Sequence, residues 1–573
     1  MTWNTRLSVS EHAMTPGDAA PTLDSYRIHE RPPESYEELR EGFTWEVPER
    51  FNLSGYLCDR WTGTDRVALI ERLADGERTH TYGELRTHAD RLANYLRDRG
   101  VERGDRVAVN GAQRVESLVT HLAAWKLGAV SVPLSVLFGP EALGFRLRDS
   151  EAVAYTVAPQ AVDAFREVKD DCDALGTALV VGTDDPEGDE VPFWDALDGR
   201  DGRFETVGTA AEEPAMILYT SGTTGSPKGV VRPHRGLLGI LPSFVLGVNM
   251  EIREDEVLRS PVEWSWAGSL NDLVMPSLYF GLSVVADDRG PFDPERELAV
   301  LEEYGVTVTG GPPTAYRFLL GHPAAEGADL GSLRVLLLGG EAAGATLVDT
   351  ARDRLPDAAI HEVYGQSEAP LFATDCEALG LPHREGRMGV PAPGHEVTVR
   401  DPETGEELGT GEVGELALRY EGNPLAFTEY WNRPDATAEK VRDGWMYCED
   451  LGSVDGDGYL GFHSRKDDVI ISSGYKVSPA EIEDTLSAHE AVANVGVIGV
   501  PDDTRGELVK AFVVLAPDRE PSDALRAELQ TFVKDRLAKY EYPRELEFVG
   551  ELPKTTTGKV RRRDLREREG IDV

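Results

Sequence analysis

Cysteine, long apolar runs and a secretion signal are scarce or missing, and each absence excludes a class of protein. The four cysteines, Cys58, Cys172, Cys376 and Cys448, form no C-x-x-C pair, which argues against a disulfide framework and a zinc site. No stretch approaches the ~18 uninterrupted apolar residues that a membrane span needs. Residues 1–21 are polar and lack a basic-then-apolar signal pattern. We therefore expect a soluble, cytoplasmic protein.

Basic residues are also few: 59 lysines and arginines face 102 acidic residues, for a net charge of −43. Nucleic-acid binding needs a basic face, so this balance argues against it. A hydrophobic content of 40% excludes a disordered acidic chain. The composition resembles that of proteins from salt-accumulating halophiles, in which salt screens the self-repulsion. Only 11 of the basic residues are lysines, so a lysine in a Gly/Thr-rich loop is a candidate functional residue.

The length of 573 residues exceeds one ordinary core and predicts two or more domains. Apolar strand patterns alternate with helical patterns from residue 67 to 338, which indicates parallel sheets covered by helices. Turn signals become dense after about residue 390. We expect a polar, poorly ordered tail over 1–34, a large α/β N-terminal domain over 35–463 with a β-rich subdomain over about 391–463, a hinge over 464–468, and a smaller, mobile α+β domain over 469–573.

The strongest motif is ILYTSGTTGSPKG, from Ile217 to Gly229, in which an apolar strand leads into a loop of hydroxyl residues and glycines. Glycines let backbone N–H groups turn toward a ligand, hydroxyls add donors, and Lys228 adds positive charge. This composition predicts a polyphosphate site. It is not a Walker A loop, because proline precedes Lys228 and glycine follows it.

The loop resembles the phosphate-binding signature of the adenylate-forming superfamily, which includes acyl-CoA synthetases, luciferases and peptide-synthetase adenylation domains. The resemblance covers roughly residues 51–566 and continues through GGE at 339–341, HEVYGQSE at 361–368, YCED at 447–450 and LPKTTTGK at 552–559. The strings YGQSE and EYPRELEFV, at 364–368 and 541–549, are similar to the medium-chain acyl-CoA synthetases.

The resemblance implies roles for individual residues in binding MgATP. Tyr364 would stack on adenine, Asp450 and Arg465 would contact the ribose, and Glu368 would hold Mg²⁺, a hard cation that suits a carboxylate. The implied catalytic residues are Lys559, Glu368 and Lys228. The implied ATP and AMP contacts are Thr220, Ser221, Gly222, Thr223, Thr224, Gly225, Lys228, Gly340, Glu341, Glu362, Val363, Tyr364, Gly365, Gln366, Ser367, Asp450, Arg465 and Lys559.

The C-terminal part resembles the mobile domain of the same enzymes. Lys559 would bridge the substrate carboxylate and the α-phosphate, where a cation offsets the repulsion of two anions. Asp467 falls on the hinge position. Lys476 stands where most relatives carry arginine. A lysine keeps the positive charge but cannot donate the two parallel hydrogen bonds by which arginine binds a phosphate. By position, coenzyme A would meet Ser473, Gly474, Tyr475, Lys476, Arg505, Tyr542 and Arg544.

Two positions bear on the acid. Acetate-specific relatives carry tryptophan where this chain has Gly365, so the glycine predicts a pocket with room for several methylenes, each worth about 0.8 kcal/mol when buried. Trp264 and Trp266 are either pocket residues or plain core aromatics, and Trp264 is the pocket candidate.

Together these features predict an AMP-forming acyl-CoA synthetase for short- or medium-chain acids longer than acetate, with ATP and coenzyme A as co-substrates. The alternatives are an acetate–CoA ligase, an enzyme that loads a separate carrier protein, and a nucleotide-binding protein that has lost catalysis.

Overall fold

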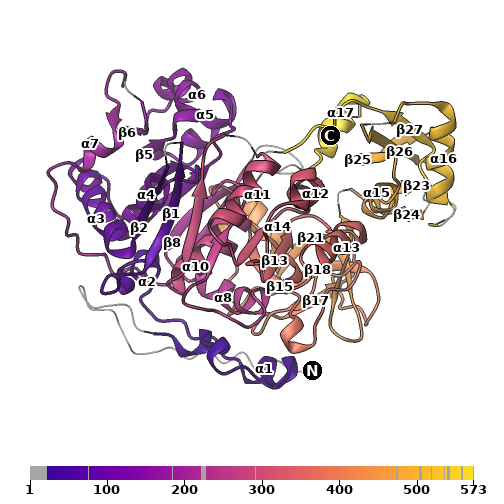
Figure 1. Cartoon of the computed structure of the whole chain (residues 1–573), viewed down its shortest axis with the longest axis horizontal. Helices are drawn as coiled ribbons and strands as arrows, with labels where there is room; N and C mark the ends of the chain where they lie inside the picture. Colours follow the sequence, from indigo (N-terminus) through magenta and orange to yellow (C-terminus); the bar gives the residue numbers. More distant parts are fainter. Residues whose placement is uncertain are drawn as a thin grey trace.

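The computed structural model describes residues 22–571 except 75, 184, 221–226, 291, 467, 473–474, 503–505, 518, 535, 538–541 and 556–558. A large body holds two extensive sheets and a β-rich subdomain, and a smaller lobe, yellow at the right of Figure 1, holds the C-terminal residues. No helix among the described residues is long and apolar enough to cross a bilayer. The predicted architecture is confirmed in this division.

The first large sheet has eight strands, and two of them, β8 and β9, flank the phosphate loop in the sequence. Its parallel part pairs β8–β4–β3–β5–β6–β7, and β9 and β19 add antiparallel strands beside β8. The strand order is β19 (Glu429–Tyr430), β9 (Lys228–Pro233), β8 (Pro214–Thr220), β4 (Val130–Leu134), β3 (Arg106–Asn110), β5 (Ala152–Val157), β6 (Thr177–Val180) and β7 (Val191–Pro192). The β8–β9 hairpin departs from the predicted all-parallel pattern.

The second large sheet has nine strands and carries the other half of the site. It joins segments that are far apart in the chain, because β1 pairs in parallel with β11. The order is β16 (Val390–Pro391), β15 (Ala369–Thr374), β14 (Ala359–Gln366), β13 (Val335–Gly339), β12 (Val308–Gly311), β10 (Val257–Arg259), β11 (Ser283–Asp287), β1 (Val67–Leu73) and β2 (Gly76–Thr81).

Helices cover these sheets, and local signals explain their boundaries. A capping box between Thr81 and Glu84 starts α3, and Gly128 ends α4 in the left-handed conformation (φ +71°). The main core cluster draws on both sheets and on α3, α4 and α8. The helices are α2 (Leu53–Leu57), α3 (Tyr82–Asp98), α4 (Val115–Leu127), α5 (Pro140–Asp149), α6 (Val162–Val168), α7 (Phe193–Leu197), α8 (Gly236–Gly247), α9 (Ala267–Ser269), the π-helical η6 (Leu270–Val274), α10 (Met275–Tyr279), α11 (Pro294–Glu303), α12 (Pro313–Gly321), α13 (Ala345–Arg354) and α14 (Pro434–Lys440).

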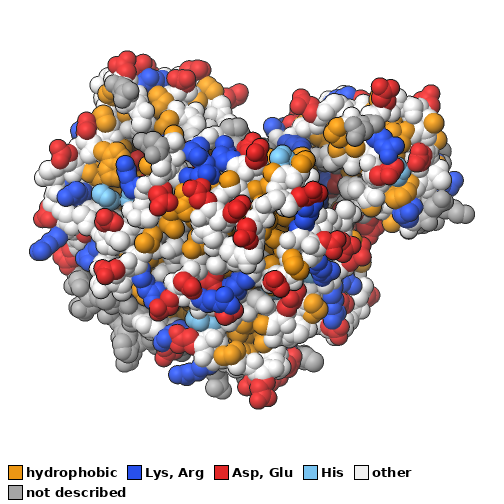
Figure 2. All heavy atoms as spheres, in the orientation of Figure 1, with side chains coloured by type: hydrophobic (Ala, Val, Ile, Leu, Met, Phe, Trp, Pro, Cys, Tyr) orange, Lys and Arg blue, Asp and Glu red, His pale blue; other side chains and the backbone are white. Residues whose placement is uncertain are grey.

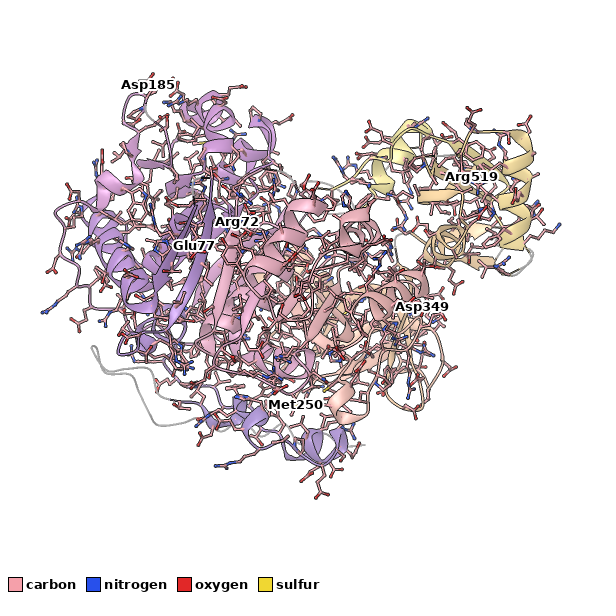
Figure 3. The ribbon with its side chains drawn as sticks, viewed as in Figure 1. Arg72, Glu77, Asp185, Met250, Asp349 and Arg519 are labelled. Atoms are coloured by element: carbon pink, nitrogen blue, oxygen red, sulfur yellow. The ribbon has the colours of Figure 1, made fainter. Side chains whose placement is uncertain are left out.

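The predicted tail is wrong for residues 22–34, which belong to the fold. Leu23 and Tyr26 are fully buried, and the Tyr26 hydroxyl donates to the Glu46 carbonyl at 2.8 Å. Helix α1 (Tyr36–Gly42) follows, and its Leu39 shares a small core cluster with Met250, which is labelled in Figure 3. Two apolar side chains within a polar stretch are enough to anchor it, and that signal was too sparse to read from the sequence.

Two smaller sheets complete the chain. The β-rich subdomain contains β17 (Val397–Arg400), β18 (Gly414–Arg419), β21 (Trp445–Val454), β20 (Val441–Arg442) and β22 (Leu460–Arg465). The C-terminal domain contains β24 (Tyr475–Val477), β23 (Ile470–Ser472), β26 (Gly506–Leu515), β25 (Val492–Asp502) and β27 (Glu545–Phe548), with helices α15 (Pro479–Ser487), α16 (Asp523–Lys534) and α17 (Arg562–Arg568). Figure 2 shows acidic side chains scattered over the whole visible face rather than gathered in one patch.

Candidate active site

The phosphate loop connects β8 to β9, and both of its ends are held by the hairpin. Thr220 pairs with Lys228 in the register, and its hydroxyl donates to the Lys228 carbonyl at 3.5 Å. Residues 221–226, which include the predicted contacts Ser221, Gly222, Thr223, Thr224 and Gly225, lie outside the described residues. The hairpin therefore fixes where Lys228 enters the site.

Tyr430 joins two of the predicted catalytic residues and was missed in the sequence. Its hydroxyl donates to a carboxylate oxygen of Glu368, and the Lys228 ammonium lies 5.1 Å from the centre of its ring. Burial, and the carboxylate of Glu368, raise the pKa of Tyr430. The residue is on the two-residue strand β19, which pairs with β9, and so short a strand leaves no periodic signal.

Arg232, on β9, supports the main chain beside Glu368. Its guanidinium is buried and donates to the carbonyls of Glu368 (3.0 Å) and Leu425 (2.7 Å). The Glu368 carboxyl group therefore stands between a fixed backbone and the Tyr430 hydroxyl. A single buried carboxylate fits a magnesium ion that takes its other oxygens from ATP phosphates and water.

The predicted ribose site is a connected group of three side chains. The Tyr364 hydroxyl donates to one Asp450 carboxylate oxygen at 2.6 Å, and Arg465 donates to the other at 3.1 Å. Burial raises the pKa of Asp450, while Arg465 and the Tyr364 hydrogen bond oppose that rise. Asp450 and Arg465 face each other in the β21–β22 register, so the hairpin itself brings them together.

Lys440 is a second residue that the sequence analysis missed. Its side chain is buried, and its ammonium lies 3.4 Å from the Glu449 carboxylate. Burial alone would lower the pKa of Lys440, but Glu368 and Glu449 together raise it. The scarcity of lysine was the signal that could have found it, since it had singled out Lys228 and Lys559.

The segment expected around adenine occupies the ends of β13 and β14. Gly340 adopts φ +89°, which favours glycine, and Thr314 donates to Glu341 at 2.6 Å. Val363 stands opposite Gly339 in the parallel register, and Gln366 donates to the Cys448 carbonyl at 3.0 Å. Burial, and the neighbouring Asp375, raise the pKa of Glu362. The remaining predicted contact, Ser367, follows β14 at the turn into β15.

Lys559 reaches this site from the C-terminal domain. A Cβ placed on Gly340 would lie 3.7 Å from the Lys559 Cε. Burial of the ammonium lowers the pKa of Lys559, and the negative charges of Glu341 and Asp450 oppose this decrease. The residue as a whole keeps exposed surface.

The loop that carries Lys559 is tied to the base of its domain. The Lys559 backbone N–H donates to the Thr555 hydroxyl at 3.1 Å, and its carbonyl accepts from the Thr555 N–H at 2.7 Å. On α17, Arg562 and Arg566 donate to Asp468 at 2.8 and 3.1 Å. The loop is thus anchored beside the predicted hinge, although Asp467 itself lies outside the described residues.

The interpretation of the acyl pocket needs two corrections. Trp264 is fully buried in the main core, whereas Trp266 keeps accessible surface and would lie 3.1 Å from a Gly340 Cβ. A Cβ at Gly365 would meet the Leu371 nitrogen at 2.2 Å. The close approach of β15 to Gly365 on β14 is therefore a packing reason for glycine that is independent of the acid, and Gly365 alone does not indicate chain length.

The predicted coenzyme A residues are only partly described. Arg544 donates to the Tyr542 hydroxyl at 3.0 Å, and the Lys534 ammonium lies 5.4 Å from the Tyr542 ring centre, so two cations share this aromatic side chain. Tyr475 and Lys476 lie on β24, opposite Ser472 and Ile471. The remaining predicted residues, Ser473, Gly474 and Arg505, lie outside the described residues.

Comparison with known proteins agrees with this geometry. Residues 60–431 match the AMP-binding enzyme family, and residues 481–559 match the AMP-binding enzyme C-terminal domain. The chain belongs to the AMP-binding enzyme family. The two matched ranges include the phosphate-loop segment, Glu368, Tyr430 and Lys559, and Asp450 and Arg465 lie between them.

The relatives of this AMP-binding enzyme are acyl-CoA synthetases. It is 33% identical over 566 residues to the acyl-coenzyme A synthetase ACSM3, mitochondrial, of Mus musculus, covering 94% of each chain. It is 34% identical over 493 residues to a feruloyl-CoA synthase of Amycolatopsis sp, covering 86% of this chain and 94% of that one. The crystal structure of the anthranilate CoA ligase AuaEII with anthranoyl-AMP superposes with a TM-score of 0.84 at 28% identity, covering 91% and 98% of the two chains.

Proposed function

We propose that this AMP-forming acyl-CoA synthetase activates a carboxylic acid longer than acetate and that its Lys559 serves only the first of two half-reactions. The observation that carries the proposal is the position of Lys559. It comes from the C-terminal domain, yet its charge interacts with Glu341 and Asp450 of the N-terminal domain. Such an arrangement suits a reaction in which two anions must meet.

In the first half-reaction a carboxylate oxygen attacks the α-phosphorus of ATP, and the bond to pyrophosphate breaks. Lys559 offsets the negative charge that develops between the two anions. Asp450 and Arg465 hold the ribose, and Lys228 faces the phosphates. Glu368 would hold Mg²⁺, which neutralises phosphate charge and orients the leaving group.

In the second half-reaction the thiolate of coenzyme A attacks the acyl carbon, and AMP leaves with its phosphate. We assign the hinge to Asp467, so that rotation withdraws Lys559 and brings the loop at Ser473 and Gly474 toward the adenylate. Domain rotation of this kind lets one nucleotide site serve two reactions in turn. Tyr542 and Arg544 are the proposed contacts to the phosphates of coenzyme A.

The preference for an acid longer than acetate rests on the resemblance to medium-chain enzymes and on relatives named for ferulate and anthranilate. Trp264 and Gly365 do not support it, for the reasons given above. A cytoplasmic location and adaptation to high salt stay predictions from composition.

The test is AMP release from MgATP in molar KCl, with and without coenzyme A, over acids from acetate to decanoate, benzoate and branched acids. We expect release that depends on coenzyme A and peaks beyond acetate. A peak at acetate would support the synthetase reaction and contradict the proposed preference for acids longer than acetate. Release with an acid but without dependence on coenzyme A would favour the loading of a carrier protein.

A further inference from the structure

An acidic side chain lies in the helical run that follows Trp266, and the proposed reaction does not use it. Segments α9, η6 and α10 form one run from Ala267 to Tyr279. Residues 269–271 and 273–279 are buried, but Asp272 between them keeps accessible surface. The run has a π-helical turn at this point, a distortion often found at functional sites.

Trp266 connects the helical run to the surroundings of Lys559. The Trp266 ring stands beside Gly340 and Lys559, and it also covers Gly268, whose Cβ would lie 2.5 Å from the indole. Gly268 and Asp272 are four residues apart, so they share a face of the helical run. Trp266 therefore lies between the surroundings of Lys559 and the face of the run that carries Asp272.

Asp272 is not neutralised by a bonded counterion. Its Oδ1 is buried and has no hydrogen-bond partner in the described part of the chain. Its nearest opposing charge is Arg232, but no ion pair within 4.0 Å joins the two among the described residues, and Arg232 donates to the Glu368 and Leu425 carbonyls instead. Burial raises the pKa of Asp272 to about 8. A buried polar atom without a hydrogen-bond partner destabilises the fold, so it needs an explanation.

We propose that Asp272 recognises a hydrogen-bond donor, a hydroxyl or amino group, at the far end of the acid. The inference rests on the proposed function and narrows its substrate class from plain hydrocarbon acids to acids with a polar end. A hydroxyl suits the protonated carboxyl group, and an amine suits the carboxylate. A pocket that hydrogen-bonds its substrate rejects the analogue without the donor far more strongly than it discriminates a methylene.

The experiment compares acids in matched sets: hexanoate with 6-hydroxyhexanoate and 6-aminohexanoate, and benzoate with its 3- and 4-hydroxy and amino derivatives. The readouts are acid-dependent ATP–pyrophosphate exchange and coenzyme A-dependent AMP release for the wild type, Asp272→Asn and Asp272→Leu. Asp349→Asn, on an exposed position of α13 labelled in Figure 3, is the matched control.

We expect at least a tenfold preference in kcat/KM for a donor-bearing acid, an intermediate ratio for Asp272→Asn, and loss or reversal of the preference in Asp272→Leu. The control should keep the wild-type ratio. A wild-type preference for the plain acids would overturn the inference while leaving the synthetase reaction intact. So would an equal loss with every acid in Asp272→Asn, which indicates a structural role. Exchange without any coenzyme A-dependent release would reject the proposed second step but still report the preference, and no exchange with any acid would reject both.

Discussion

The nucleotide half of the site and the lysine that serves it are built in different ways. In the N-terminal domain, Tyr364 and Arg465 both donate to Asp450, and Tyr430 donates to Glu368, so these side chains are in place before a ligand arrives. Lys559 instead comes from a loop of another domain and keeps exposed surface. A rigid receptor combined with a removable cation suits two reactions on one nucleotide.

The largest effect should come from removing Lys559, the part of the site that we propose to move. Lys559→Ala should reduce adenylate formation by about 10²- to 10³-fold, the usual cost of deleting a group that stabilises transition-state charge. Thioester formation from supplied acyl-AMP should stay within about threefold, since the lysine would have left the site by then. Pyrophosphate exchange and thioester assays measure the two steps.

Lys554→Ala is the control for that substitution, because Lys554 lies in the same segment with its ammonium 5.9 Å from the Phe318 ring centre. Equal losses in both half-reactions for Lys559→Ala would contradict the division between a fixed and a movable part.

A substitution in the fixed part should affect both steps. Asp450→Ala removes the acceptor of Tyr364 and Arg465, and hydrogen bonds to charged groups are worth about 1.5–3 kcal/mol. We expect kcat/KM to fall about 10- to 100-fold for ATP in the first step and for acyl-AMP in the second. Asp457→Ala, on an exposed turn before β22, should change neither. A loss confined to the first step would show that the ribose contact is not kept through the rotation.

A smaller effect should distinguish the two contacts of Tyr430, the hydrogen bond of its hydroxyl to Glu368 and the contact of its ring with Lys228. Tyr430→Phe keeps the ring beside Lys228 and removes only the hydroxyl that donates to Glu368. We expect about a threefold to tenfold fall in kcat/KM, with a higher magnesium concentration for half-maximal rate, since one hydrogen bond contributes about 0.5–1.5 kcal/mol. Tyr420→Phe, whose hydroxyl donates to the Thr428 carbonyl at 3.1 Å, is the control. An unchanged magnesium dependence would remove Tyr430 from the positioning of Glu368.

The smallest effect concerns pH. In the enzyme without ligand, the pKa of Lys559 lies below its ordinary value of 10.5, so the ammonium loses its proton as the pH rises through that lower value. The kcat/KM of adenylation should therefore fall on the alkaline side below pH 10.5, while thioester formation from acyl-AMP should not follow it. Lys559→Arg should move this limb to higher pH, since arginine stays protonated. A limb that stays in place in Lys559→Arg would assign it to another group.

Some residues of the candidate site could be predicted from the sequence, and others could not. Contiguous motifs gave Lys228, Glu368 and Lys559, because a loop or a strand end carries each of them. Tyr430 was out of reach, since its strand has two residues and its partner Glu368 is 62 residues away in the chain. Trp264 and Trp266 are two residues apart in the same motif, and only packing shows that the first belongs to the core and the second to the site.

By itself, the sequence determined the family, the division into a large and a small domain, and the residue types that meet ATP, because these depend on local strand-to-loop motifs and on composition. The tertiary structure alone decided which groups meet: that Tyr364 bonds to Asp450, that Gly365 packs against the backbone of β15, and that the Asp272 Oδ1 is buried without a hydrogen-bond partner in the described part of the chain. Such contacts join segments that are far apart in the chain, and their geometry follows from the packing of whole sheets and helices rather than from any local pattern.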